Sequence, residues 1–205
     1  MVFPIELAAT LSGASRTQLN RWRSTGLLVP EIQAYRPPLY SFRDLVALRA
    51  VVFLRAETSL QRVRRAFANL PEMNFSEHPA EYKLATDGRT IVIWTEDGFV
   101  DLVNNPGQMN FYSLADIYRP FVAKSGKKVP DFERPRRHIS VNAGRVGGWP
   151  TIEGSRLPYD TVANLVAGGE VSHSMVSRYF PGVSEAAVRD AVDFAEDVLL
   201  HKQAG

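Results

Sequence analysis

The chain contains no cysteine. Disulfides, thiolate metal sites and cysteine nucleophiles are therefore excluded, and a reducing compartment is compatible with the composition. Long apolar runs are also missing, since no stretch approaches the ~18 consecutive apolar residues of a membrane-spanning helix. The chain does not start with basic residues ahead of an apolar segment, so it does not look like a secretory signal. These absences predict a soluble, cytoplasmic protein without membrane contact.

Clustered metal-binding or catalytic motifs are missing as well. The four histidines, His78, His138, His173 and His201, stand apart, with no carboxylate or histidine at metal-ligand spacing. His173 has a serine on either side, but neighbours on one helix point in different directions and do not form a triad. We therefore predict no catalytic residue, no metal site and no cofactor, and we expect the chain not to be an enzyme.

Lysine is absent from residues 1–70, although this segment carries ten arginines against four acidic residues, a net charge of +6. The whole chain has a formal charge of +2, so residues 71–205 sum to −4. Any single arginine could simply belong to a solvated surface. Positive charge concentrated at one end nevertheless favours a polyanionic partner.

The same basic segment has the pattern of short helices separated by a tight turn. A short apolar helix is followed by Ser12-Gly13-Ala14, which favours a turn. Ser15 can cap a second helix over about 16–24, in which Leu19 and Trp22 face inward. This is the pattern of a helix-turn-helix, whose second helix enters the major groove of DNA.

The next residues have the pattern of a wing. Residues 27–40 contain two extended halves around a polar centre, which places Arg36 where it could reach a backbone phosphate. Ser41, with Asp44 three residues later, predicts a capping box at the start of a third helix, and a fourth helix is expected from Ser59.

Three runs within this segment, ELAATLSGASRTQLNRWRSTGLLVP, YSFRDLVALRAVVFLR and SLQRVRRAFANL, resemble the MerR-type winged helix-turn-helix. The resemblance implies double-stranded operator DNA as a partner. Two positions depart from the family, Arg23 where an acidic residue is common and Asn20 where an arginine is usual, so a base preference does not carry over. The candidate DNA-binding residues are Arg16, Thr17, Asn20, Arg21 and Arg23 on the second helix, Arg36 on the wing, and Tyr40 and Arg43 near phosphates.

The middle of the chain changes to the pattern of a β-sheet. Strands are expected over 82–86, 90–94 and 99–103, joined by Asp-Gly turns at 87–88 and 97–98. Because the central strand is apolar on both faces, helices or a second subunit must cover it. We expect a scaffold or dimer contact, with a partner groove as the alternative. A basic stretch follows that we interpret as a linker, with a second DNA backbone contact as the alternative; it contains Lys124, Lys127, Lys128, Arg134, Arg136 and Arg137.

The last third of the chain predicts a short strand at 139–141, a glycine-rich turn, and three helices over about 159–167, 172–179 and 184–201. The last helix has an apolar stripe of period 3.6. Its outer face is acidic and is expected to repel DNA; the acidic residues are Glu185, Asp190, Asp193, Glu196 and Asp197.

This region resembles a second family, the small domain catalogued as domain of unknown function 433, through GWPTIEGSRLP at 148–158 and YFPGVS at 179–184. Such domains occur in antitoxins encoded beside a PIN-like toxin. A MerR-like head joined to such a tail is similar to the VapB-type antitoxins of actinobacteria. The resemblance does not specify which residues contact a toxin.

Taken together, these patterns predict an α+β, mainly helical protein in three parts. The parts are a winged helix-turn-helix at 1–72, a β-rich middle segment with the basic linker at 73–130, and a domain of three helices and a short β-hairpin at 131–205. The expected function is that of a homodimeric, DNA-binding antitoxin of a type II, VapBC-like system, which neutralises a PIN-like toxin and autoregulates its operon. The alternatives are a MerR-like regulator that responds to a small ligand on the middle sheet, or an interaction scaffold. A nuclease is disfavoured because no carboxylate cluster is visible.

Overall fold

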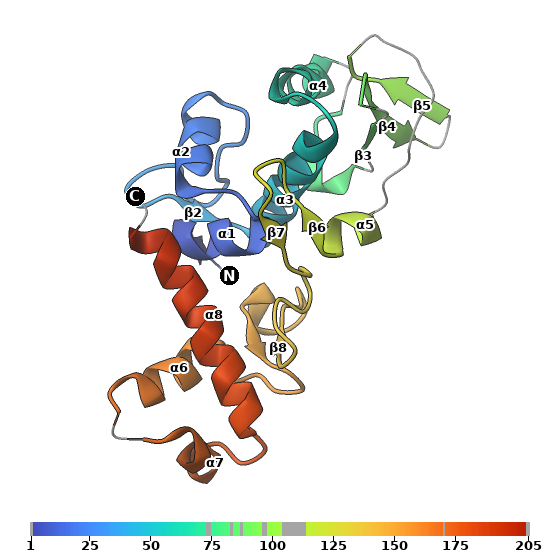
Figure 1. The fold of residues 1–205 in the computed structure, drawn as a ribbon. Helices are drawn as coiled ribbons and strands as arrows, with labels where there is room; N and C mark the ends of the chain where they lie inside the picture. Colours follow the sequence, from blue (N-terminus) through green and yellow to red (C-terminus); the bar gives the residue numbers. More distant parts are fainter. Residues whose placement is uncertain are drawn as a thin grey trace.

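The computed structural model describes residues 2–72, 75–82, 84–86, 88–95, 98–103, 114–169 and 171–203. Runs of helices and small antiparallel sheets make up this part of the chain, which agrees with an α+β fold. The N-terminal helices and the middle sheet lie at one end of the molecule and the last helices at the other (Figure 1).

Two short helices begin the chain, α1 (Ile5–Ser12) and α2 (Arg16–Ser24). Gly13 ends α1 with a φ of 81°, and a Cβ there would lie 2.5 Å from Val129 Cγ2, so the turn requires glycine for its conformation and for space. Ser15 and Gln18 form a capping box at the start of α2. The second helix thus has the predicted bounds and the predicted cap.

The segment between α2 and the third helix pairs differently from the predicted wing. Gln33 and Leu39 form an isolated bridge, which leaves Arg36 in the exposed loop between them. The second extended half is β2 (Leu39–Tyr40), which pairs with β1 (Phe3–Pro4) rather than with the first half. Phe3 and Tyr40 are both buried, and this burial favours pairing with the N-terminal strand.

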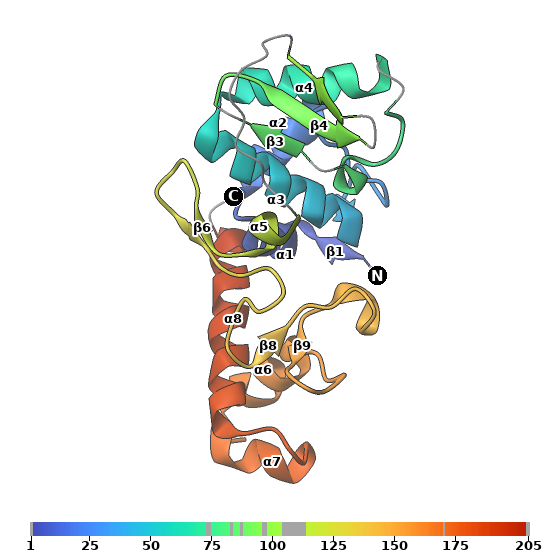
Figure 2. The same ribbon diagram turned by 90° about the vertical axis from the view of Figure 1, so that its right-hand side faces the viewer.

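Two longer helices follow, α3 (Phe42–Glu57) and α4 (Leu60–Glu72). Ser41 and Asp44 form the predicted capping box. Figure 2 shows α3 running between α4 and the sheet on one side and α1 on the other. Its central position explains why it is buried on nearly all faces, with Leu45, Leu48 and Val51 at 1% exposure or less.

The middle sheet has the predicted three antiparallel strands, β3 (Leu84–Thr86), β4 (Ile91–Thr95) and β5 (Gly98–Asp101), with β4 in the centre. A short 3-10 helix, η1 (Pro79–Glu81), precedes them. The sheet packs on α3 and α4, which bury Ile91, Val92 and Ile93. The two helices of the same chain therefore supply the predicted cover. Asp87 and Asp97, of the two predicted turns, lie outside the described residues.

The predicted basic linker differs from the structure. After α5 (Leu114–Tyr118), strands β6 (Phe121–Val122) and β7 (Lys128–Val129) pair as a hairpin that has Lys124 and Gly126 in its turn. Val129 and the nearby Phe132 are buried, with at most 1% exposure. These apolar anchors hold the basic stretch against the helices, whereas its lysines remain outside.

Arg49 connects α3 to this hairpin. Its side chain is fully buried and donates hydrogen bonds to the carbonyl oxygens of Leu11, Ile117, Tyr118, Arg119 and Pro130. The guanidinium also lies 5.0 Å from the ring of Phe121 and 5.5 Å from that of Phe132. Burial lowers the pKa of Arg49 to about 10, so it stays charged at neutral pH. One of the ten arginines of the basic segment thus holds the fold together and cannot reach a partner.

The last third forms a small hairpin of β8 (Ile139–Ser140) and β9 (Thr151–Ile152), with the 3-10 helix η2 (Val146–Gly148) between the strands. Helices α6 (Tyr159–Ala167), η3 (His173–Met175), α7 (Val176–Tyr179) and α8 (Glu185–Gln203) follow. The α6 and α8 bounds agree closely with the predicted helices. Leu199, which the apolar stripe places inside, is 52% exposed.

The C-terminal part packs directly on the N-terminal helices. The C-terminal end of α8 lies against α1 (Figure 1). The Trp149 ring stacks on Phe3 at 5.8 Å, and a Cβ at Gly148 would lie 2.4 Å from Phe42 Cδ2. Buried side chains from all three predicted parts form a single core cluster. The predicted domain boundaries are therefore not gaps in the packing.

Candidate nucleic-acid interface

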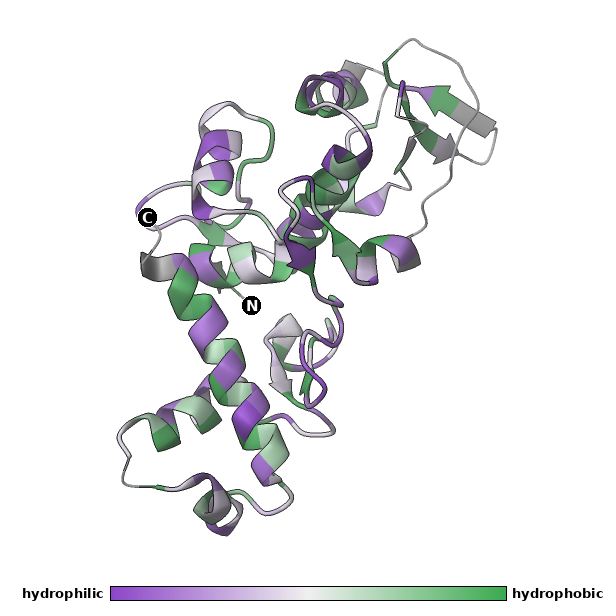
Figure 3. Cartoon of the chain, in the orientation of Figure 1, coloured by the Kyte–Doolittle hydropathy of each residue, from purple (hydrophilic) through white to green (hydrophobic). Residues whose placement is uncertain are grey.

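Helix α2 presents a polar face to solvent. Leu19 and Trp22 are each 1% exposed and fix the inner face, whereas Thr17, Asn20 and Arg21 are exposed. Figure 3 shows α2 and α4 as largely hydrophilic helices. The exposed face of α2 therefore carries three of the predicted DNA-binding residues, with no part of the described chain covering them.

One flank of α2, which we call the wing side, faces the loop at 31–38. Arg23 Nη1 donates to the Ala34 carbonyl oxygen at 3.1 Å, and the guanidinium lies 5.2 Å from the centre of the Tyr35 ring. Arg43, at the start of α3, makes two hydrogen bonds to the Glu31 carboxylate, of 2.9 and 3.4 Å. Both arginines thus have partners within the chain, whereas Arg36 is exposed at the end of the loop.

Arg16, at the start of α2, also has internal partners. It lies 3.6 Å from the Glu6 carboxylate and donates to the His201 carbonyl oxygen at 3.4 Å. The second contact connects the N-terminal helices to the last turns of α8. Contact of Arg16 with a phosphate would require it to exchange these partners.

Tyr40 lies in the core rather than at the surface. It is 1% exposed, and its hydroxyl has no hydrogen-bond partner among the described residues. Burial raises the pKa of Tyr40 to about 12, against a smaller opposing effect of Arg23. A direct contact between Tyr40 and a phosphate, which the MerR resemblance implies, does not fit this position.

The other flank of α2 borders a basic groove, which the sequence patterns do not predict. Arg21 of α2, Arg55 of α3, Arg64 of α4 and Lys124 of the β6–β7 turn line a pocket of about 470 Å³. A second pocket of about 290 Å³ shares Arg55 and Lys124. Burial lowers the pKa of Arg55, and the neighbouring charge of Arg21 lowers it further. The sequence signals are the arginine count and the basic stretch that contains Lys124, for which a DNA backbone contact is the alternative; neither predicts the groove, because it joins residues from four separate elements.

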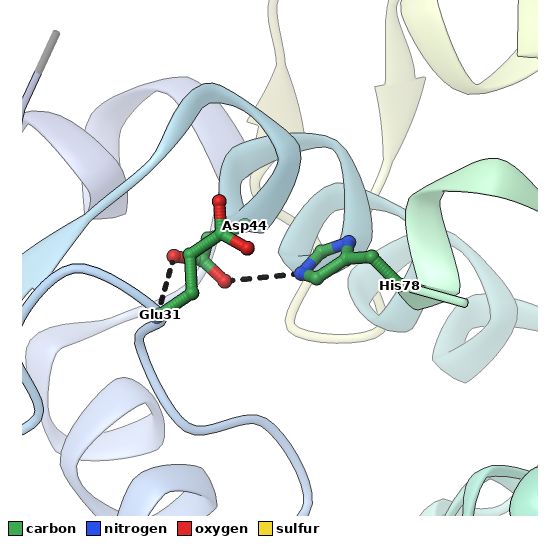
Figure 4. A group of neighbouring side chains, drawn as sticks. All are labelled: Glu31, Asp44 and His78. Carbon is green, nitrogen blue, oxygen red and sulfur yellow. Dashed lines mark hydrogen bonds and ion pairs between the residues drawn. The ribbon is translucent and has the colours of Figure 1, made fainter. Parts of the chain in front are cut away.

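A cluster of Glu31, Asp44 and His78 is a second grouping that the sequence did not indicate (Figure 4). Asp44 caps α3 and also accepts the backbone N–H of Glu31, and His78 Nε2 lies 3.2 Å from Asp44 Oδ1. His78 Nδ1 accepts the backbone N–H of Ala80, so the ring proton is on Nε2 and donates to Asp44. A metal at Nε2 would require the opposite tautomer. The hydrogen bonds therefore favour a structural role, which ties the wing loop, α3 and the segment before the sheet together.

The acidic face of α8 is partly neutralised within the chain. Asp190 accepts hydrogen bonds from the His138 backbone N–H at 2.9 Å and lies 2.7 Å from His138 Nδ1. Asp197 pairs with Arg136. Of the predicted acidic residues, Glu185, Asp193 and Glu196 remain exposed.

None of the described helices combines the length and apolar character needed to cross a membrane.

Comparison with known proteins gives a fold relative and a domain match. No curated protein matches the sequence. The crystal structure of Rv2018 from Mycobacterium tuberculosis is similar, with a TM-score of 0.55 and 19% identity, over 93% of this chain and 97% of that chain. This likeness concerns the fold alone. Residues 139–195 match the family model described as "Protein of unknown function (DUF433)", which confirms the resemblance found for the C-terminal segment.

Proposed function

We propose that residues 1–72 form a winged helix-turn-helix that binds double-stranded operator DNA, with α2 as the helix in the major groove. The observation that carries this proposal is the exposed face of α2, where the side chains of Thr17, Asn20 and Arg21 have no hydrogen-bond partner among the described residues and lie beside a cationic groove. In the major groove of DNA, asparagine pairs with adenine, and arginine pairs with guanine or phosphate. Arg36 on the wing loop is the further candidate contact.

The proposal includes a homodimer. A single helix-turn-helix offers few base contacts, and a two-fold symmetric operator requires two copies of the recognition helix about one helical turn apart. The chain then binds cooperatively to paired half-sites.

We further propose that the C-terminal domain makes the chain an antitoxin of a type II, VapBC-like system, in which it holds a PIN-like toxin while the N-terminal region autoregulates the operon. Support comes from the match of residues 139–195 to the DUF433 model together with the sequence resemblance of the whole architecture to VapB-type antitoxins. The exposed acidic residues of α8 are unsuited to DNA, which leaves this domain for a protein partner.

The DNA proposal is tested with a duplex that contains the chain's own upstream region. Asn20→Ala and Arg21→Ala should each weaken binding by about 1–3 kcal/mol, measured by fluorescence anisotropy. Arg178→Ala, which removes an exposed arginine from α7, is the matched control and should leave binding unchanged. Equal affinity of the wild type and both α2 variants would contradict the assignment of α2.

The antitoxin proposal is tested by co-expression with the product of the neighbouring gene. We expect a small PIN-like protein that co-purifies with the chain and whose toxicity the chain suppresses. A neighbouring transporter or enzyme operon, with no co-purifying partner, would instead support the ligand-responsive regulator.

A further inference from the structure

The basic groove lies along one flank of α2, opposite the wing side. At 100° per residue, Gln18, Arg21 and Thr25 share this flank, whereas Arg16 and Arg23 share the other. Arg64 Nη2 donates to Thr25 Oγ1 at 3.1 Å, which fixes α4 beside the end of α2. The turn of the β6–β7 hairpin forms the remaining wall through Lys124.

The charges in this groove have no anionic partner in the described part of the chain. None of Arg21, Arg55, Arg64 and Lys124 forms an ion pair with a described carboxylate. The Nε atoms of Arg55 and Arg64 are buried and lack a hydrogen-bond partner among the described residues. Arg55 instead lies over the Trp22 ring at 5.8 Å, which holds its guanidinium in place. Four like charges in one groove repel one another, and a bound anion would offset this repulsion.

The start of α4 adds to the attraction for an anion. Ser59, Leu60 and Gln61, at the first turn of this helix, line the same pocket. Ser59 Oγ, just before the helix, accepts the Arg62 N–H at 3.3 Å. The N–H groups of Leu60 and Gln61 have no acceptor within the helix, and the helix dipole places partial positive charge at this end. Guanidinium groups and helix N-termini together are the usual donors to phosphate oxygens.

We propose that the basic groove is a phosphate-binding site, and that in the DNA complex it takes a backbone phosphate next to α2. The second part rests on the DNA binding proposed above. A recognition helix in the major groove has a phosphate backbone on each side, since that groove is only about 12 Å wide. The wing side faces one backbone, and the basic groove faces the other. The β6–β7 hairpin, from outside residues 1–72, thereby becomes part of the DNA interface.

The test uses the full chain with Lys124→Gln and with the double variant Arg64→Gln, Lys124→Gln. Lys124 is exposed in a hairpin turn, so its replacement leaves the core intact, whereas Arg55 is avoided because it packs on Trp22. Arg65→Gln is the control, because Arg65 is exposed on α4 outside the groove. Two probes are used: the upstream duplex at several salt concentrations, and pyrophosphate alone in thermal unfolding.

We expect Lys124→Gln to weaken duplex binding about tenfold and to lower the slope of log affinity against log salt by about one, with a larger loss in the double variant. Arg65→Gln should leave both unchanged, and pyrophosphate should raise the melting temperature of the wild type but not of the double variant. If the wild type binds the duplex and the groove variants bind equally well, or if Arg65→Gln has the same effect as they do, the groove is not part of the interface.

The two proposals fail in distinguishable ways. If the wild type binds no duplex, the proposed function fails, and the pyrophosphate result decides the groove by itself. Stabilisation that is lost in the double variant then supports a site for a free phosphorylated molecule. Equal melting temperatures with and without pyrophosphate, in a wild type that binds no duplex, overturn the phosphate site as well.

Discussion

Arginines lie along both flanks of α2, but those on one flank contact other groups of the chain and those on the other flank lack a carboxylate partner among the described residues. On the wing side, Arg23 and Arg43 contact the Ala34 carbonyl oxygen and the Glu31 carboxylate. On the groove side, Arg21 and Arg55 have no carboxylate partner among the described residues. An arginine whose donors are already used must exchange one contact for another to bind DNA, whereas a free one gains a contact. The difference teaches that the count of arginines overstates the number available to the proposed DNA partner, and that Arg21 and Arg55, which lack a carboxylate partner within the described chain, lie on the groove side.

Arg49 shows a third state, in which the arginine is buried. Its replacement should affect stability more than that of an arginine on either flank. Arg49→Leu should lower the free energy of unfolding by about 3–5 kcal/mol, because five carbonyl oxygens lose their donor inside the protein. Urea unfolding followed by circular dichroism measures this loss. Arg49→Lys should be intermediate, since an ammonium group has only three donors. An Arg49→Leu variant as stable as the wild type would mean that other donors satisfy these carbonyls.

A smaller change in stability should distinguish an arginine on the wing side from one on the groove side. Arg23→Ala should cost about 1 kcal/mol of unfolding free energy, because it removes a hydrogen bond to the wing loop and the contact with the Tyr35 ring. Arg21→Ala should change it by less than about 0.5 kcal/mol. Hydrogen exchange should speed up at residues 31–38 in the first variant alone. The comparison breaks if both variants lose the same stability and the loop exchanges equally in both.

Tyr40, a buried residue next to the wing side, should have little effect at pH 8 and a larger one at high pH. Tyr40→Phe should change the free energy of unfolding by less than about 1 kcal/mol at pH 8, because the buried hydroxyl has no partner among the described residues. The folded-state pKa of about 12 exceeds the ordinary value of 10.0, so the unfolded chain ionises first as the pH rises. The wild type should therefore lose stability relative to the variant between pH 10 and 12.

Denaturant unfolding of both proteins at pH 8 and pH 11 checks this prediction. Tyrosines common to both chains cancel in the difference. Parallel pH profiles would show that Tyr40 ionises as easily in the folded protein as in the unfolded chain, and would return it to the set of surface candidates.

The helix caps, the bounds of α2 and the strands of the middle sheet can be predicted from the sequence, because they depend on residues close together in the chain. The caps at Ser15 and Ser41 depend on a side chain and a backbone three residues apart, and both are present. The bounds of α2 and the three strands of the middle sheet also follow from short-range patterns of apolar and turn residues. The resemblance to DUF433 rests on two short runs, at 148–158 and 179–184, and the family model matches residues 139–195 around them.

The candidate site is harder to predict from the sequence, because residues far away in the sequence decide whether a charged side chain is buried, paired or exposed. Arg49 and Arg55 are similar residues on one helix, yet the carbonyls that bury the first come from α1, α5 and the segment after β7. The basic stretch with Lys124 has the pattern of a linker, because the pairing of β6 with β7 and the contact of Val129 with Gly13 are not visible in local sequence. The MerR resemblance implies that Tyr40 lies near a phosphate, whereas pairing with Phe3, far away in the sequence, puts it in the core.

By itself the sequence determined that the N-terminal end is basic, where its helices begin and end, and that the C-terminal segment is similar to DUF433 domains. Only the tertiary structure decided which arginines hold the fold, which are paired, and which join Lys124 beside α2. The physical reason is range. Capping and periodicity act within one turn of helix, whereas the burial and pairing of a charge depend on whatever group the fold brings within a few ångströms of it.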